Sequence, residues 1–150
     1  IRLSRMNVPE IYDENYTLDI NKAVTLKEGK DVSVFVTGDL LAEVMKANEI
    51  LKAKGIDAEI INIPVIKPLD CGTIISSVNK TGLAVTVENH SVIGGLGSAV
   101  CETLSENAPH KVLRIGINDT FGQSGTPNEL LKHYELDAES IANKIIELKK

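Results

Sequence analysis

Apolar and polar positions along this chain follow two different periods that take turns. Near-continuous apolar, β-branched runs predict buried strands. Between them, apolar residues recur every three to four positions, as on the inner face of a helix. The clearest helix begins at Asp39, a residue suited to an N-cap, and ends at Gly55. Strands separated by helices in this way predict a mostly parallel sheet covered on both faces.

The pattern predicts five strands and five helices after an N-terminal segment. The expected strands are residues 23–29, 31–38, 57–66, 83–89 and 111–117. The expected helices are residues 39–55, 71–81, 95–108, 126–134 and 138–150, of which the second is capped by Asp70 and the last by Asp137. The β-branched character of residues 31–38 further predicts a strand buried on both faces.

Residues 1–16 differ from the rest of the chain. The chain begins with Ile1, and the alternation of Ile1 and Leu3 with Arg2 and Ser4 predicts a strand already in progress. We therefore expect the tail of a longer chain, with residues 1–16 as the end of a preceding domain and its linker. Residues 17–150 are expected to form one domain.

Composition is that of a globular domain. The chain has 150 residues, of which 43% are hydrophobic and 25% charged, enough for one core without a metal or disulfide. Its formal charge of -5 argues against general nucleic-acid binding, which needs a basic face. No run approaches the roughly 20 apolar residues of a membrane span, and the start does not resemble a signal peptide. A cytoplasmic protein that binds neither nucleic acid nor membrane is expected.

Cysteine and histidine offer little chemistry. Cys71 and Cys101 form no CxxC pair and have no histidine in ligand spacing, which fits a reducing compartment. Both are predicted to be buried small residues. His110 and His133 are expected at the surface, beside the ends of helices.

A glycine-rich stretch, VENHSVIGGLGSAV at residues 87–100, connects a predicted strand to a predicted helix. Turns of this kind hold phosphates in many α/β proteins, which makes Gly94, Gly95 and Gly97 a candidate anion or interface site. The spacing matches neither GxGxxG nor GxxxxGK[ST]. We favour a structural role, in which the glycines let the helix start close to the sheet.

Glu88 and His90 are the candidate acid–base pair. Because they are two apart on an extended segment, they point the same way at the end of a strand. A buried histidine held by a carboxylate, or a contact with another domain, would explain the pair equally well. The chain has no GxSxG motif and neither cysteine has an adjacent base, so nothing predicts a nucleophile. The polar loop at 119–127 is long enough to meet a partner.

Arginine near the N-terminus is the remaining candidate. Arg5 closes the strand-like LSR, and an arginine at a strand end can bind phosphate through two parallel hydrogen bonds. Arg2 lies in the same segment. For an arbitrary sequence, a solvated surface arginine would be the better interpretation.

Four segments in order carry a family resemblance: LSRMN (3–7), the linker VPEIYDE, VTVENHSVIGGLGSAV (85–100) and GINDTFGQSGTPNELL (116–131). Together they resemble the C-terminal part of transketolase, most closely the form split into N- and C-terminal subunits. Two other families share this domain, deoxyxylulose-phosphate synthase and the β chain of 2-oxo acid dehydrogenases. FGQSGTPNELL followed by LDAESI is more similar to transketolase.

The resemblance implies a fold and a domain division. The fold is a three-layer α/β/α sandwich on a five-stranded, mixed, mostly parallel sheet, with AVTL as one antiparallel edge strand. Residues 1–16 would be the end of the pyrimidine-binding domain and a linker, and residues 17–150 the transketolase C-terminal domain.

The resemblance also implies a function for the complete enzyme: transfer of a two-carbon ketol unit from a ketose phosphate to an aldose phosphate. Thiamin diphosphate and a divalent metal (Mg) would lie between the two preceding domains, so no cofactor or metal contact is expected on this chain, which would be inactive alone. Its partners would be the remaining domains or an N-terminal subunit, in a homodimer acting on sugar phosphates.

One residue with a family function matches. The substrate-phosphate-binding arginine falls on Arg5, although Met6 replaces the glutamine that commonly follows it. Outside this family, the chain could instead be a stand-alone regulatory module that binds an anion or nucleotide at the glycine-rich turn.

Overall fold

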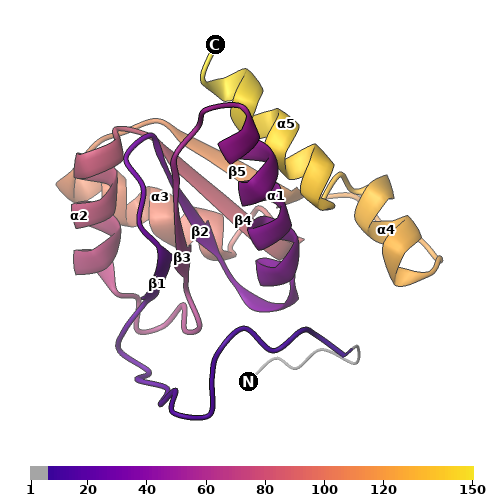
Figure 1. The fold of residues 1–150 in the computed structure, drawn as a ribbon, viewed down its shortest axis with the longest axis horizontal. Coiled ribbons are helices and arrows are strands. Elements are labelled where there is room, and N and C mark those ends of the chain that lie inside the picture. Colours follow the sequence, from indigo (N-terminus) through magenta and orange to yellow (C-terminus); the bar gives the residue numbers. More distant parts are fainter. Residues whose placement is uncertain (1–6) are drawn as a thin grey trace.

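The computed structural model describes residues 7–150 and consists of one five-stranded sheet with helices on both faces (Figure 1). The strands are β1 (Val24–Lys27), β2 (Val32–Val36), β3 (Ala58–Asn62), β4 (Ala84–Ser91) and β5 (Val112–Ile117). The helices are the 3-10 turn η1 (Gly38–Leu40), α1 (Leu41–Ala53), α2 (Cys71–Thr81), α3 (Leu96–Asn107), α4 (Pro127–His133) and α5 (Ala138–Leu148).

The strand order is β1-β3-β2-β4-β5. β2 pairs in parallel with both β3 and β4, and β4 pairs in parallel with β5. β1 is the antiparallel edge strand, with Val24 opposite Asn62. The α/β sandwich with one antiparallel strand is therefore confirmed.

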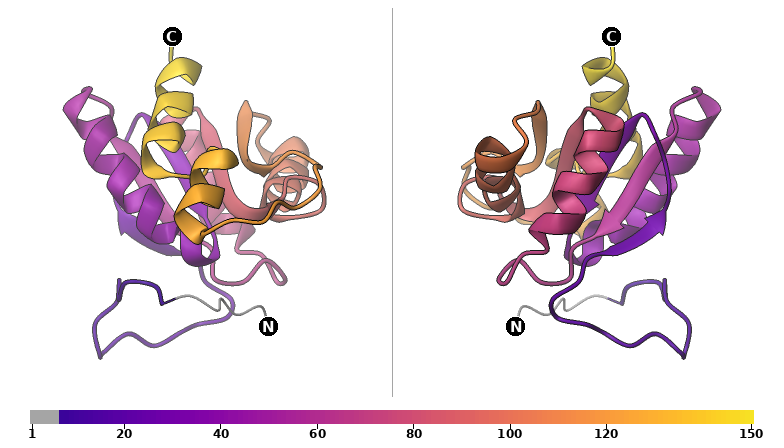
Figure 2. Two further views of the ribbon diagram at one scale, coloured as in Figure 1. Left: turned by 90° about the vertical axis from the view of Figure 1, so that its right-hand side faces the viewer. Right: turned by 90° about the vertical axis from the view of Figure 1, so that its left-hand side faces the viewer.

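Two apolar layers hold the helices to the sheet. Alternate residues of β2 face opposite sides, so Val34 joins the core beneath α1 and α5, whereas Phe35 joins the core beneath α2 and α3. All five residues of β2 are buried, as the β-branched run predicts. Figure 2 shows the two helix layers on either side of the sheet.

Two of the three predicted helix caps are confirmed. Asp70 accepts the backbone N–H of Thr73 at 3.1 Å, and Asp137 accepts that of Ser140 at 3.2 Å. The Asp39 cap is wrong, because Asp39 lies inside η1 and Leu40 takes the N-cap position of α1 without a side-chain hydrogen bond. The 3-10 turn moves the start of α1 past the aspartate.

Two further expectations are corrected. The third strand ends at Asn62 rather than residue 66, since Pro64 and Pro68 in the following segment cannot donate to a ladder. Cys71 is exposed, because it is the first residue of α2 and its turn faces solvent, while Cys101 is half-buried. His133 is exposed as expected, and His110 is half-buried.

One edge of the sheet collects the functional candidates. The carboxyl ends of β2 to β5 lie at the edge where the N-terminal segment runs, opposite the C-terminus of the chain (Figures 1 and 2). We call this the carboxyl edge. Within residues 7–150, no helix is long and apolar enough to cross a membrane.

Candidate functional site

The glycine-rich turn joins the end of β4 to the start of α3 at the carboxyl edge. Glu88 lies on the face of β4 that packs against α3, the same face as Ala84 and Thr86, as the strand period requires. Its side chain is about 1% exposed. A carboxylate buried this deeply needs hydrogen-bond donors around it.

Those donors are backbone amides of α3. The N–H groups of Leu96 and Gly97 donate to the two carboxylate oxygens of Glu88, at 2.8 Å each. The first amides of a helix have no partner within the helix, and they carry the positive end of its dipole. Glu88 thus neutralises the start of α3 from the neighbouring strand. We call this arrangement the Glu88 clamp.

Two glycines make the clamp sterically possible. A Cβ on Gly95 would lie 1.9 Å from Oε2 of Glu88, and a Cβ on Gly97 would lie 2.8 Å from Cδ of Arg114. Gly94 differs, since its φ of +76° is a left-handed conformation and a Cβ there would meet nothing within 4 Å. Close packing of the carboxylate therefore explains Gly95, close packing of the Arg114 stem explains Gly97, and the turn itself explains Gly94.

The clamp bears on the anion-site hypothesis. A phosphate at this turn would need the helix amides that Glu88 already occupies, and it would meet the carboxylate's negative charge. This geometry favours the structural role of the glycines. Anion binding or interface formation by Gly94, Gly95 and Gly97 stays a prediction.

His90 lies beside the clamp rather than within it. Its Nδ1 is 4.0 Å from Oε2 of Glu88 and 2.9 Å from the carbonyl oxygen of Ser91, to which it can donate. Its side chain is about half exposed. The structure therefore brings Glu88 and His90 to the same end of β4, as predicted, with the acid buried and the imidazole in solvent.

Arg114 is a residue that sequence reasoning missed. It lies on β5, and its Nη1 donates to the carbonyl oxygen of Val92 at 2.9 Å, across the glycine-rich turn. Its aliphatic stem covers Gly97. A charged residue inside an apolar strand, as in VLRIGI, is the signal that could have identified it.

The loop after β5 is ordered by side chains of α4 and of the residues that cap it. The Tyr134 hydroxyl accepts the N–H of Gln123 at 2.9 Å and donates to the carbonyl oxygen of Phe121 at 3.3 Å. Thr126 and Glu129 form a reciprocal capping box at the start of α4. Despite this order, the Phe121 side chain is 94% exposed. The predicted partner contact of loop 119–127 therefore has an apolar group available for it.

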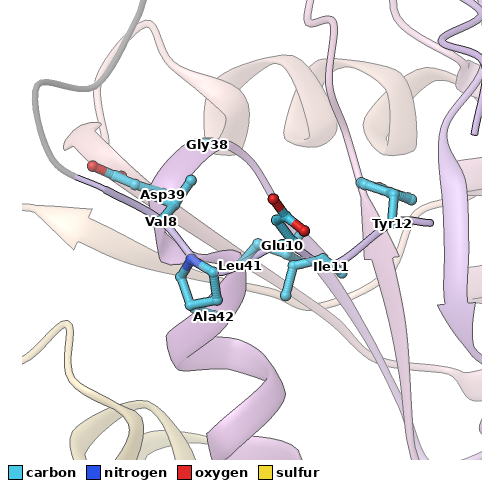
Figure 3. Close-up of a pocket in the computed structure, with 9 residues that line it drawn as sticks. Val8, Glu10, Ile11, Tyr12, Gly38, Asp39, Leu41 and Ala42 are labelled. Atoms are coloured by element: carbon cyan, nitrogen blue, oxygen red, sulfur yellow. The ribbon is translucent and has the colours of Figure 1, made fainter. Parts of the chain in front are cut away.

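The N-terminal linker crosses the other half of the carboxyl edge. Residues 8–12, the η1 turn at Gly38 and the start of α1 at Ala42 line a mostly apolar hollow of about 340 Å³ (Figure 3). The Asn62 side chain donates to the Tyr12 hydroxyl at 2.7 Å. Burial raises the pKa of this hydroxyl above its usual value. The linker is thus attached to the end of β3.

A polar groove between β1 and α2 contains a second buried carboxylate, that of Glu59. Glu59 accepts hydrogen bonds from Ser77 and Lys80, and Lys80 also pairs with Glu28. The hydrogen bond to Glu28, which is the larger cause, and the one to Glu59 raise the pKa of Lys80. Because these side chains satisfy one another's hydrogen-bonding groups, we interpret the groove as a structural feature.

The described part of the chain offers no set of side chains or free helix amides at the glycine-rich turn that would hold a metal ion or a diphosphate. Residues 7–150 contain no group of three or more His, Cys, Asp or Glu side chains that could hold a metal ion. The helix amides at the glycine-rich turn are occupied by Glu88. These residues do not fit a thiamin diphosphate and metal site. Arg5, the candidate phosphate ligand, lies outside the described residues.

Comparison with known proteins gives consistent matches. A family model for the transketolase C-terminal domain matches residues 21–141. A protein from Methanocaldococcus jannaschii, described as a transketolase C-terminal section, is 47% identical over 98% of this chain and 46% of its own length. A 6-deoxy-6-sulfo-D-fructose transketolase subunit from Clostridium sp. is 43% identical over 94% of this chain and 44% of its own length.

Proteins described as a different enzyme also match. A 1-deoxy-D-xylulose-5-phosphate synthase from Caldanaerobacter subterraneus is 39% identical over 85% of this chain and 21% of its own length.

Among solved structures, a split-gene transketolase described as an inactive beta4 tetramer superimposes with a TM-score of 0.91 at 41% identity, over 97% of this chain and 49% of that one. This chain spans about half the length of its transketolase relatives, and it belongs to the transketolase C-terminal domain family.

Proposed function

We propose that this chain is the C-terminal domain of a split transketolase, which transfers a two-carbon ketol unit from a ketose phosphate to an aldose phosphate. The domain supports assembly with the remaining domains or an N-terminal subunit in a homodimer, and it is inactive alone. In the complete enzyme, thiamin diphosphate and a divalent metal supply the carbanion chemistry, on domains other than this one.

The structural match to a split-gene transketolase carries this proposal, because it extends over 97% of the chain at 41% identity. The Glu88 clamp supports a non-catalytic role for the domain, since it occupies the amides that an anionic ligand would use. The descriptions of two relatives as a transketolase C-terminal section and as a transketolase subunit support assembly with further domains or a partner subunit.

Arg5 is the residue of this chain proposed to touch substrate. Its guanidinium would bind the terminal phosphate and thereby place the reacting carbonyl. In the complete enzyme, Arg5→Ala should raise KM for a phosphorylated acceptor by about tenfold, because charge-assisted hydrogen bonds are lost. KM for an unphosphorylated acceptor should stay within about twofold of the wild type. An equal rise for both acceptors would exclude this role.

A second candidate activity is supported by the 39% identity to a 1-deoxy-D-xylulose-5-phosphate synthase. The reconstituted enzyme should be assayed with xylulose 5-phosphate plus ribose 5-phosphate, and separately with pyruvate plus glyceraldehyde 3-phosphate. Turnover of the first pair alone supports ketol transfer. Turnover of the second pair alone would assign the chain to a synthase instead.

A further inference from the structure

The linker has no helix or strand from residue 7 to 23, yet specific contacts hold it to the domain. Its first attachment is at Ile11, which packs against the α1 and α5 core, and at Tyr12, whose hydroxyl accepts the Asn62 amide at 2.7 Å. Its second attachment is at Ala23, whose N–H donates to Asp70 at 3.1 Å. Both hydrogen-bond partners lie on the carboxyl side of β3, so the linker is fixed at two points on that edge.

Between these attachments, local turns shape the chain. The Tyr12 and Tyr16 rings stack with centroids 3.9 Å apart and planes 19° apart. The turn between them is closed by the N–H of Tyr16, which donates to the carbonyl oxygen of Asp13 at 3.1 Å. Stacking holds the Tyr12 ring in one orientation, which directs its hydroxyl to Asn62.

Asn62 is a suitable fixed point. It is the last residue of β3, pairs with Val36 and Val24 on the two adjacent strands, and is about 8% exposed. A buried amide donor without a partner would be costly, so the Tyr12 hydroxyl also stabilises Asn62. Unlike Asn62, Val8 is about half exposed. It lines the hollow near the start of α1, where Figure 3 shows it with Asp39 and Ala42.

We propose that Tyr12 is a positioning residue of the complete enzyme. Its hydrogen bond with Asn62 fixes the course of residues 8–12 across the carboxyl edge, and so fixes where the preceding segment with Arg5 joins the domain. This inference rests on the proposed phosphate-binding role of Arg5, which precedes Val8 by only three residues. Because residues 8–12 connect this domain to the segment that carries the arginine, the Tyr12 hydrogen bond would set how the domain meets the part of the enzyme that binds the substrate phosphate.

The test uses the complete enzyme with Tyr12→Phe, which removes the hydroxyl and keeps the stacked ring. Hydrogen–deuterium exchange should become about fivefold faster in residues 8–16, as expected for loss of one hydrogen bond that holds this segment. KM for a phosphorylated acceptor should rise about threefold while kcat stays within twofold. Ser105→Ala, which removes an exposed hydroxyl that bonds only within α3, is the control and should alter neither linker exchange nor KM.

Asn62→Ala and the double variant complete the test. If both residues act through one hydrogen bond, exchange in the double variant should equal that of the faster single variant. Unchanged linker exchange in Tyr12→Phe would overturn the proposal, as would faster exchange with an unaltered KM in an enzyme where Arg5→Ala raises it. If Arg5→Ala does not distinguish phosphorylated acceptors, the phosphate-binding role fails, and with it the link from Tyr12 to substrate, whatever the linker does.

Discussion

Helices α2 and α3 lie side by side on one face of the sheet, and each begins with its amides bound to a carboxylate. At α2 the carboxylate belongs to Asp70, the residue immediately before the helix. At α3 it belongs to Glu88, which lies on β4 and is separated from Leu96 by seven residues. The same electrostatic requirement is met locally in one helix and by tertiary packing in the other.

The difference lies in what each arrangement demands of its surroundings. Gly72, near the start of α2, has room for a side chain, since a Cβ would lie 3.7 Å from Asp70. Gly95 has none, because a Cβ would lie 1.9 Å from Glu88. A partially exposed cap tolerates change around it, whereas a buried clamp restricts every residue that it touches.

Alanine at the two glycines should separate the helix starts most strongly. Gly95→Ala should lower the free energy of unfolding by about 3 kcal/mol, because Glu88 must leave its amides or the turn must move. Gly72→Ala, in an exposed helical position, should raise that free energy by about 0.5 kcal/mol. Urea denaturation of the two variants checks this, and equal effects would show that the clamp is not tightly packed.

Neutralising each carboxylate should give the next largest contrast. Glu88→Gln should cost about 2 kcal/mol, since the amide group presents one acceptor oxygen to two N–H groups and loses the charge. Asp70→Asn should cost at most about 0.5 kcal/mol, because asparagine is itself a good N-cap. Chemical denaturation monitored by circular dichroism measures both changes. A larger cost at Asp70 than at Glu88 would reverse the comparison.

The smallest expected effect is the loss, at acid pH, of the stability that the Asp70 cap contributes to α2. Burial opposes ionisation of Asp70, but hydrogen bonds from Thr73 and the Ala23 N–H outweigh it, so its pKa is lowered. A lowered pKa adds stability above the unfolded value of about 3.9, and that stability is lost as the pH falls through the folded value. Asp70→Ala should therefore cost about 1 kcal/mol at pH 7, and this difference should shrink below about pH 4.

Thermal unfolding from pH 7 to pH 2.5 measures this difference. Gly72→Ala is the control, because its difference from the wild type should not depend on pH. A constant gap between wild type and Asp70→Ala across the whole range would show that the carboxylate is not the stabilising group.

The elements that could be predicted from sequence are those whose cause is local. The apolar run of β2 and the caps Asp70 and Asp137 involve residues within one element or its neighbour, so their patterns survive in the sequence. Asp39 had the right residue type for a cap but lies inside a 3-10 turn. The division of the chain at residue 16 and the role of Arg5 stay predictions.

The candidate site could be predicted only in part. The strand period placed Glu88 and His90 on one face at one strand end, where the structure has them. It did not show that Glu88 would reach the α3 amides, that Arg114 would cover Gly97, or that Tyr12 would meet Asn62. Each of these contacts depends on how separate elements pack, which has no fixed spacing in sequence.

The sequence by itself determined the alternation of strands and helices, the two-sided burial of the sheet, and where α2 and α5 begin, because these follow from backbone periodicity and adjacent side chains. Only the tertiary structure decided what the glycine-rich turn holds. The turn resembles an anion site, but the first amides of α3 are bound by the chain's own Glu88 carboxylate. Only the packing of β4 against α3 brings this strand residue to the start of the helix, and no sequence spacing encodes that contact.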